Sequence, residues 1–290
     1  MINTYKSNYL QQSGHGSDFT IKVFDLPKKF DNYYVESCRA AEYIYANRTG
    51  KLHLLYSGGI DSEYMVSVFL DLKMDIVPVI IRLNNNYNEH DIQHAFKFCE
   101  SKNINPLVVD IDFDEFVISG KLLDITQQIK SSQYQYAVTS YVAGLLDGTV
   151  LLGEGEPYIK LNDVSQRWDI VIYEYEQAID NYFEQQGIYG TPHFNRYSSE
   201  MFLSFLNDDR YKELASNLIP GKLSSFSSKY IVYNRHSNFN LKSRSKYHGY
   251  EIIERSEIFN HDAFKEIEKF SKNYNGVYSV DYFEFMKEDK

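Results

Sequence analysis

Short apolar runs alternate with helical segments between residues 52 and 152, and this alternation most constrains the fold. The apolar runs with the length of strands are 52–56, 76–83, 106–111 and 149–152. The segments with helical spacing are 35–47, 60–72, 89–102, 113–120 and 133–146. Short apolar runs are typical of strands buried on both faces, and their alternation with helices indicates βαβ units. The sequence therefore predicts an α/β fold with a doubly wound, mainly parallel sheet over residues 35–160.

The periodicity is weaker outside this stretch. Residues 1–34 carry little pattern and are predicted to form an N-terminal segment. Beyond the sheet, 158–161 and 168–174 fit strands, and the helical segments are 177–186, 198–206 and 263–274. We expect residues 161–290 to be a mostly helical C-terminal extension that completes the functional site.

Bulk composition limits the classes of protein. The 290 residues are 43% hydrophobic and 24% charged, which is typical of a globular chain. The net charge of −10 argues against a general nucleic-acid binder, whose affinity comes mainly from neutralising phosphates. We expect no membrane span and no signal peptide, because no apolar run is long enough. Two isolated cysteines, Cys38 and Cys99, fit a reducing compartment, so a cytoplasmic location is predicted.

One window departs from this acidic balance. Residues 221–250 contain no Asp or Glu, and their cations are Lys222, Lys229, Arg235, Lys242, Arg244 and Lys246. The frequent tyrosines, 26 in all, are also typical of an AT-rich genome such as that of a phage or a bacterium.

A glycine-containing hexapeptide connects the first predicted strand to the helix after it. Its residues are Ser57, Gly58, Gly59, Ile60, Asp61 and Ser62. Glycines let a backbone approach a ligand closely, and a helix N-terminus directs free N–H groups and a positive dipole end at the same point. Asp61 would repel a phosphate unless a divalent cation bridges the two, so the loop predicts a phosphate site with Mg²⁺. The alternative is a tight turn in which Asp61 and Ser62 cap the helix.

In this context the hexapeptide resembles the signature of the PP-loop superfamily, the N-type ATP pyrophosphatases or adenine nucleotide alpha hydrolase-like proteins. That superfamily includes asparagine, GMP, NAD and argininosuccinate synthetases and tRNA lysidine synthetase. The resemblance covers residues 50–160 and implies a HUP-type fold in which the hexapeptide binds ATP. It further implies cleavage of ATP to AMP and pyrophosphate, with adenylation of a carboxylate or carbonyl oxygen and displacement of AMP by a nitrogen or sulfur nucleophile. No Gly-Lys-Ser/Thr follows, so the loop is not a Walker A loop.

A second motif narrows the resemblance. Residues 150–156 read VLLGEGE, similar to the Gly-Glu-Gly-x-Asp-Glu loop of asparagine synthetases. Gly153, Glu154 and Gly155 match, Glu156 stands one position before the family's Asp, and Pro157 replaces that Asp. The resemblance implies that Glu154 is catalytic and that Glu156 binds Mg²⁺ together with Asp61. A glycine-rich turn with solvated glutamates is the alternative.

Cations elsewhere are further candidates. In the basic window, Lys242, Arg244 and Lys246 are predicted to stabilise the leaving pyrophosphate. A solvated basic loop is the alternative reading of these three. Arg82 follows the second strand and is a candidate for the adenine or ribose, because ligands of such sheets lie beyond the carboxyl ends of the strands.

Features of the glutamine-using asparagine synthetases are missing from this sequence. Residue 2 is Ile2 rather than a catalytic cysteine, and no amidase domain precedes the loop. Ammonia would then come from solution or from a separate glutaminase partner, and a small molecule is expected as acceptor. The leading hypothesis is an AMP-forming ligase of C–N bonds. The alternatives are a tRNA- or nucleobase-modifying enzyme, in which residues 221–250 touch nucleic acid, and a nucleotide-binding module without turnover.

Overall fold

The computed structural model describes residues 9–24, 26–131, 133–216, 221–244 and 249–287. Its centre is a five-stranded sheet in which every neighbouring pair is parallel. In spatial order its strands are β5 (Leu107–Ile111), β4 (Val77–Leu83), β3 (Leu52–Leu55), β6 (Thr149–Leu152) and β9 (Tyr189–Thr191). The strand order reverses direction between β3 and β6, so a ligand crevice is expected beyond the carboxyl ends of these two strands.

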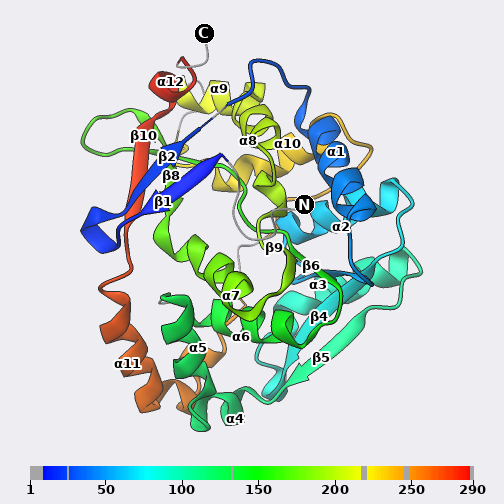
Figure 1. The fold of residues 1–290 in the computed structure, drawn as a ribbon, viewed down its shortest axis with the longest axis vertical. Coiled ribbons are helices and arrows are strands. Elements are labelled where there is room, and N and C mark those ends of the chain that lie inside the picture. Colours follow the sequence, from blue (N-terminus) through cyan, green and yellow to red (C-terminus); the bar gives the residue numbers. More distant parts are fainter. Residues whose placement is uncertain (1–8, 25, 132, 217–220, 245–248, 288–290) are drawn as a thin grey trace.

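Helices cover both faces of this sheet (Figure 1), which confirms the predicted doubly wound α/β fold. Leu54 of β3 shares a core with the helices α1 (Tyr33–Ala46), α2 (Ile60–Asp71), α3 (Glu89–Ser101) and α8 (Ser199–Leu206). Its neighbour Leu55 shares the opposite core with α4 (Phe113–Ile118), α5 (Lys121–Ile129), α6 (Tyr134–Leu145), α7 (Ala178–Gln186) and α11 (Asp262–Ser271). Successive side chains of a strand point to opposite faces, so apolar runs bury the sheet on both sides.

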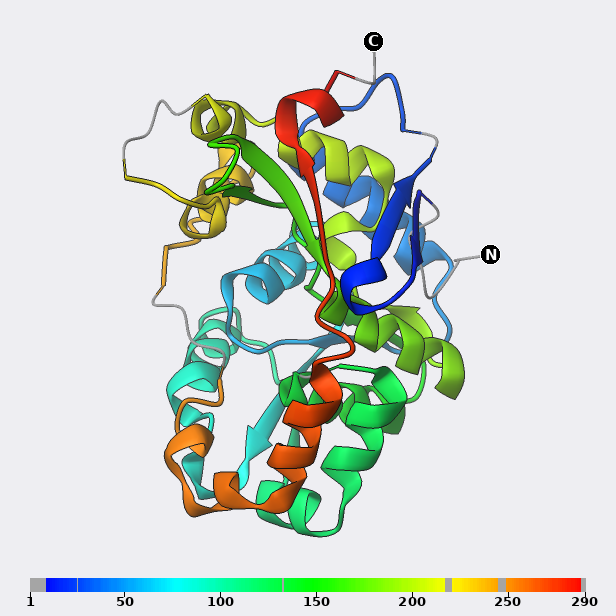
Figure 2. The same cartoon turned by 90° about the vertical axis from the view of Figure 1, so that its left-hand side faces the viewer.

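A second, antiparallel sheet stands beside the first. It consists of β7 (Tyr158–Leu161), β8 (Trp168–Tyr173) and β10 (Val277–Asp281), with β8 in the middle. The hairpin of β1 (Leu10–Ser13) and β2 (Thr20–Val23) lies next to β10 (Figure 2). The remaining helices are α9 (Asp209–Ala215), α10 (Lys229–Arg235) and α12 (Tyr282–Phe285). The 3-10 helices are η1 (Gly16–Asp18), η2 (Asn84–Asn86), η3 (Glu174–Gln177), η4 (Phe194–Arg196), η5 (Phe226–Ser228), η6 (Ile253–Arg255) and η7 (Glu257–Asn260).

The predicted helices and strands of residues 35–160 are present, with ends within a few residues of the prediction. The sequence did not predict α5, α9, α10, the hairpin, β9 or β10. The extension is rich in helices, yet it supplies β8 and β10 to the second sheet and β9 to the first. The division into 1–34, 35–160 and 161–290 stays a prediction, although Leu10, Ala41 and Phe202 from the three stretches share one core. Within the described residues, every helix is too short or too polar to cross a bilayer.

The short strand β9 escapes prediction because a glycine occupies its middle. Gly190 has φ +149°, and a Cβ there would lie 1.8 Å from the Val150 carbonyl oxygen. Only glycine therefore allows β9 to pair with β6 at Val150. The chain then continues into Pro192 and Asn195, which hold the loop after β6, so this pairing also positions the site described below.

Two identical substitutions test this account. We expect Gly190→Ala to lower the free energy of unfolding by about 2–4 kcal/mol, because the methyl group cannot fit against β6. Gly144→Ala, in α6, is expected to raise it by about 0.5–1 kcal/mol, because the nearest atom to its new Cβ is 3.5 Å away and alanine favours the helix. Urea unfolding of both variants measures the difference, and effects of equal sign would contradict the role given to Gly190.

Candidate functional site

The predicted phosphate loop leads from β3 into the N-terminus of α2. Gly59 is the N-cap residue, and its N–H donates to Ser57 Oγ at 3.2 Å. Ser62 Oγ donates to the Gly59 carbonyl at 3.0 Å. The first backbone N–H groups of α2 have no partner within the helix, so they are available to an anion. Gly58 takes φ +90° and Ile60 begins the helix.

The loop after β6 lies directly against the start of α2. A Cβ at Gly153 would be 2.7 Å from the Cα of Ser62, so only glycine permits this approach. Asn195 Nδ2 donates to the Gly153 carbonyl at 2.7 Å, and the Glu154 N–H donates to the Pro192 carbonyl at 3.3 Å. The two carboxylates after Gly153 are therefore held beside the phosphate loop by residues that follow β9.

A cavity of about 630 Å³ opens between these two loops, at the place where the strand order reverses. The predicted residues that line it are Ser57, Gly59, Asp61, Ser62, Gly153, Glu154 and Glu156. Leu55, Val79 and Ile81 form an apolar wall. Pockets of 300–1,000 Å³ with an apolar lining and a few polar groups commonly bind small molecules.

The ammonium group of Lys229, from α10, joins the two carboxylates that the sequence predicts as metal ligands. Lys229 Nζ donates to Asp61 Oδ2 and, at 2.7 Å, to Glu156 Oε1. The hydroxyl of Tyr233, one turn along α10, donates to Asp61 Oδ1 at 2.7 Å. Lys229 is only 4% exposed, so this cluster is largely shielded from water. Three segments far apart in the sequence thus meet at one ion pair network.

Burial and mutual repulsion change the protonation of these groups. The pKa of Asp61 is raised to about 6, mainly by burial and then by Glu156, with Lys229 acting in the opposite direction. Burial, followed by the charges of Glu156 and Asp61, raises the pKa of Glu154 to about 8. Burial would lower the pKa of Lys229, but Asp61 and Glu156 outweigh it and raise that pKa. Lys229 is therefore charged, whereas Glu154 is mostly protonated at pH 7 and becomes half-ionised only near pH 8.

The site fits Mg²⁺ only as a cation shared with a phosphate. Among the described residues no group of three or more His, Cys, Asp or Glu side chains could hold a metal by itself. Mg²⁺ is commonly bound by one or two carboxylates together with substrate phosphates and water. Asp61 and Glu156 could supply the carboxylates, since one lysine leaves part of the charge of Asp61, Glu154 and Glu156 unbalanced.

The predicted cations of the basic window lie in different places. Arg244 contacts the phosphate loop, donating to the Gly58 carbonyl and, at 2.5 Å, to Glu63 Oε2. Lys242 is exposed. Lys246 lies outside the described residues.

Arg82 points away from the cavity. Strand alternation places Val79 and Ile81 in the cavity wall, so Arg82 lies on the opposite face of β4. There its guanidinium forms a two-bond ion pair with Asp110 of β5, at 2.6 and 3.0 Å. Half of the Arg82 side chain is exposed, and its proposed contact with adenine or ribose stays a prediction.

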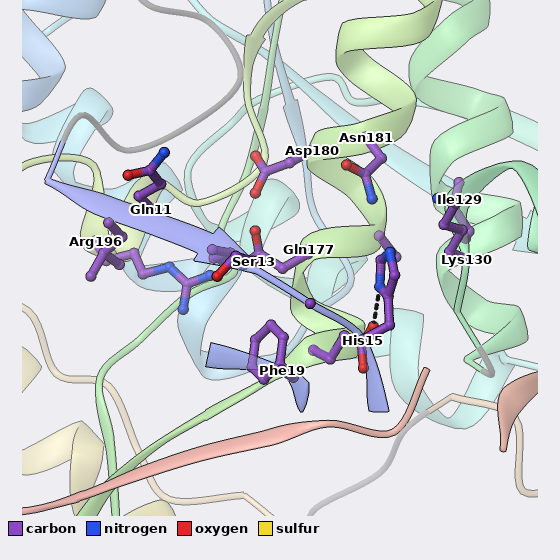
Figure 3. Close-up of a pocket in the computed structure, with 15 residues that line it drawn as sticks. Gln11, Ser13, His15, Phe19, Ile129, Lys130, Gln177, Asp180, Asn181 and Arg196 are labelled. Atoms are coloured by element: carbon purple, nitrogen blue, oxygen red, sulfur yellow. Dashed lines mark hydrogen bonds and ion pairs between the residues drawn. The ribbon is translucent and has the colours of Figure 1, made fainter. Parts of the chain in front are cut away.

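A smaller cavity of about 340 Å³ lies under the N-terminal hairpin (Figure 3). Two of its acids already have partners: His15 Nδ1 is 2.7 Å from Glu174 Oε1, and Asp180 Oδ2 is 2.9 Å from His193 Nε2. Arg196 lines this cavity and donates to Glu176 of the larger one at 2.6 Å. None of the candidate residues from the sequence lines the smaller cavity, so we place the functional site in the larger one.

Sequence reasoning missed Lys229 and Tyr233 as site residues. Lys229 belongs to the acid-free window 221–250, but nothing in the pattern separates it from the other cations there. Tyr233 is one of 26 tyrosines and carries no local signal.

Comparisons with known proteins give limited similarity. No protein-family model matches the chain, and no curated protein matches it in sequence. A predicted tRNA methyltransferase subunit from Methanocaldococcus jannaschii is 19% identical, over 64% of this chain and 88% of that one, with a TM-score of 0.31.

Two further solved structures are similar at the same level. The U34-tRNA thiolase NcsA from Methanococcus maripaludis, solved with its 4Fe-4S cluster, is 16% identical over 74% of this chain and 86% of its own, with a TM-score of 0.33. NMN synthetase from Francisella tularensis is 15% identical over 74% and 97%, with a TM-score of 0.31. With TM-scores this low, the functional argument rests on the residues of this chain.

Removing the central lysine should strongly destabilise the fold. Lys229→Met leaves Asp61 and Glu156 without their cation, and loss of one partner of a buried ion pair costs about 3–5 kcal/mol. Guanidinium unfolding at pH 8 measures this loss. The control Lys212→Met, on the exposed face of α9, should change stability by less than about 0.5 kcal/mol. Equal effects of the two substitutions would contradict the central position of Lys229.

The raised pKa of Glu154 predicts that the free energy of unfolding falls as the pH rises. Because the folded-state pKa of about 8 lies above the ordinary 4.5, the folded state binds the proton more tightly. Its contribution to stability is complete below pH 4.5 and is lost as the pH rises towards 8. Glu154→Gln, which stays neutral, should match the wild type at pH 4.5 and exceed its free energy of unfolding by about 2 kcal/mol at pH 9.

The control for this comparison is Glu42→Gln, on the exposed face of α1, which should follow the wild type at every pH. A stability difference between Glu154→Gln and wild type that does not grow with pH would contradict the raised pKa.

Proposed function

We propose that this chain is an ATP-dependent adenylating enzyme of the PP-loop type, which converts ATP to AMP and pyrophosphate and activates a carboxylate or carbonyl for a nitrogen nucleophile. The observation that carries the proposal is that the phosphate loop (residues 57–62) and the loop after β6 (residues 153–156, the GEGE loop) meet across one cavity, where the strand order of the sheet reverses. The hexapeptide resemblance supports the same reaction class. Asparagine-synthetase-like chemistry is the finer form of the proposal and rests on the second motif.

Each group has a place in this mechanism. Backbone N–H groups of Gly59 and the first turn of α2, with the hydroxyls of Ser57 and Ser62, bind the phosphates. Mg²⁺, when bound, would offset negative charge on the phosphates, with Asp61 and Glu156 as its protein ligands. The apolar wall of Leu55, Val79 and Ile81 suits the adenine base.

Lys229 and Glu154 complete the chemistry. Lys229 holds Asp61 and Glu156 in place and supplies a positive charge beside the phosphate loop. The ionised fraction of Glu154, which grows as the pH rises towards its pKa of about 8, would accept a proton from the nucleophile. Arg244 fixes the phosphate loop through the Gly58 carbonyl. Catalysis would then depend on positioning and electrostatics.

The test is ATP turnover by the purified chain with MgCl₂, a panel of carboxylic acids, and ammonia or amines, with AMP and ADP resolved by chromatography. We expect AMP and pyrophosphate, and a loss of about 10²–10³-fold in rate for Asp61→Ala. The exposed control Asp163→Ala should keep the wild-type rate.

ADP as the product would refute the proposed reaction. AMP formed only when tRNA is the acceptor would support the nucleic-acid-modifying alternative instead. Tight ATP binding without AMP under any condition would favour a nucleotide-binding module.

A further inference from the structure

A row of five aromatic rings lines the side of the larger cavity that is nearest to the second sheet and faces the GEGE loop. Tyr173 and Tyr175 stack with centroids 5.1 Å apart and an interplanar angle of 14°. Tyr136 of α6 lies 6.0 Å from Tyr175, and Tyr158 of β7 lies 6.3 Å from Tyr173. Phe226 ends the row, 6.3 Å from Tyr158, and all five rings line the cavity.

The tyrosines of this row differ from those of the core. Buried core tyrosines use their hydroxyls: Tyr33 donates to the Asn195 carbonyl, Tyr211 to the Pro157 carbonyl and Tyr282 to the Leu206 carbonyl. The hydroxyls of Tyr136, Tyr158 and Tyr175 make no hydrogen bond within the part of the chain that the structure describes. Packing alone does not require phenol groups at these positions, so the row has the character of a binding surface.

The charge beside the row is negative. The acidic side chains that line the cavity are Asp61, Asp91, Glu154, Glu156, Glu176 and Glu254, and Lys229 is its one lysine or arginine among the described residues. Lys229 is engaged by Asp61 and Glu156, and Glu176 is paired with Arg196. Glu154 has no hydrogen bond or ion pair to any described side chain. An unpaired carboxylate therefore stands next to a set of aromatic faces.

We propose that the aromatic row and Glu154 form a subsite for an organic ammonium ion, so that the nitrogen nucleophile is a primary amine with an apolar or aromatic substituent. This inference rests on the proposed function and names its nucleophile. Cations bind over the faces of tyrosine rings within about 6 Å of the centroid, more strongly where water is excluded. The protein already uses this contact, since Lys229 Nζ lies 4.3 Å from the centre of the Phe226 ring.

The negative lining favours an amine over a nucleobase. A stacked base would arrive with phosphates, and these would face the unbalanced acids of this half of the cavity. A free ammonium ion could contact Glu154 and one ring, but it is too small to cover the row of five aromatic rings. A substituted amine uses both features at once.

The transfer step balances with the groups at hand. The bound ammonium ion loses one proton, and the nitrogen lone pair attacks the carbonyl carbon of the acyl adenylate. The C–O bond to the phosphate breaks, and its electron pair leaves with AMP. The nitrogen loses a second proton as the amide forms, so the products are a substituted amide, AMP and two protons.

Calorimetric titration with phenethylamine hydrochloride at pH 8.5, without ATP, tests the subsite, because this pH lies above the pKa of Glu154 and below that of a primary amine. The uncharged analogue 2-phenylethanol and ammonium chloride are titrated in parallel. We expect phenethylammonium to bind at least 10-fold more tightly than either. Glu154→Gln and Tyr175→Leu should each weaken it about 10-fold, whereas Tyr175→Phe should retain it. Tyr43→Leu, exposed on α1, is the control.

Each outcome decides one point. The inference would be overturned if phenethylammonium and phenylethanol bound equally, or if neither bound to the folded wild-type protein. Tighter binding of free adenine at this subsite would also overturn it. Turnover assays distinguish the amine subsite from the proposed function. If ammonia supports AMP formation and no substituted amine does, the amine subsite is refuted and the adenylating activity is supported. Tight amine binding without AMP from any acceptor supports the subsite and removes the activity.

Discussion

The ion pair network around Lys229 is the interaction on which the site depends. Its ammonium group joins Asp61 of α2 to Glu156 of the loop after β6, and it comes from α10, more than 70 residues from either along the chain. Two carboxylates this close together, both only partly exposed, would repel each other without it. The lysine therefore holds the phosphate loop and the GEGE loop next to each other, and it forms part of the cavity wall.

The excess of acid in the cavity decides what can bind there. One lysine cannot neutralise Asp61, Glu154 and Glu156, so a polyphosphate needs a divalent cation, whereas an organic cation is attracted directly. The two halves of the cavity accordingly suit different ligands. The α2 end offers backbone N–H groups and an apolar wall, and the end near the second sheet offers aromatic faces beside Glu154. The proposed reaction, which joins an acid to an amine, would use both.

Local patterns were sufficient for four of the five strands of the main sheet and for the two loops of the candidate site. Apolar runs such as Leu52–Leu55 predicted buried strands because a strand buried on both faces has no polar alternation. Both loops were found because their glycines, Gly58, Gly59 and Gly153, follow strands, where a residue without a side chain lets the backbone approach a ligand or another segment closely. Arg82 shows what position along a strand leaves open: it stands at a strand end, but the alternation of β4 directs its side chain to the face opposite Val79 and Ile81.

The sequence alone thus determined an α/β sheet, the alternation of its first four strands with helices, and the candidate phosphate loop, because these depend on contacts between neighbours along the chain. The tertiary structure alone decided that Lys229 and Tyr233 complete the site, that β9 joins the main sheet, and that five aromatic residues share one wall. Each of these depends on contacts between segments far apart in the chain. Such contacts leave no periodicity to read, because their partners are set by how helices and sheets pack rather than by local spacing.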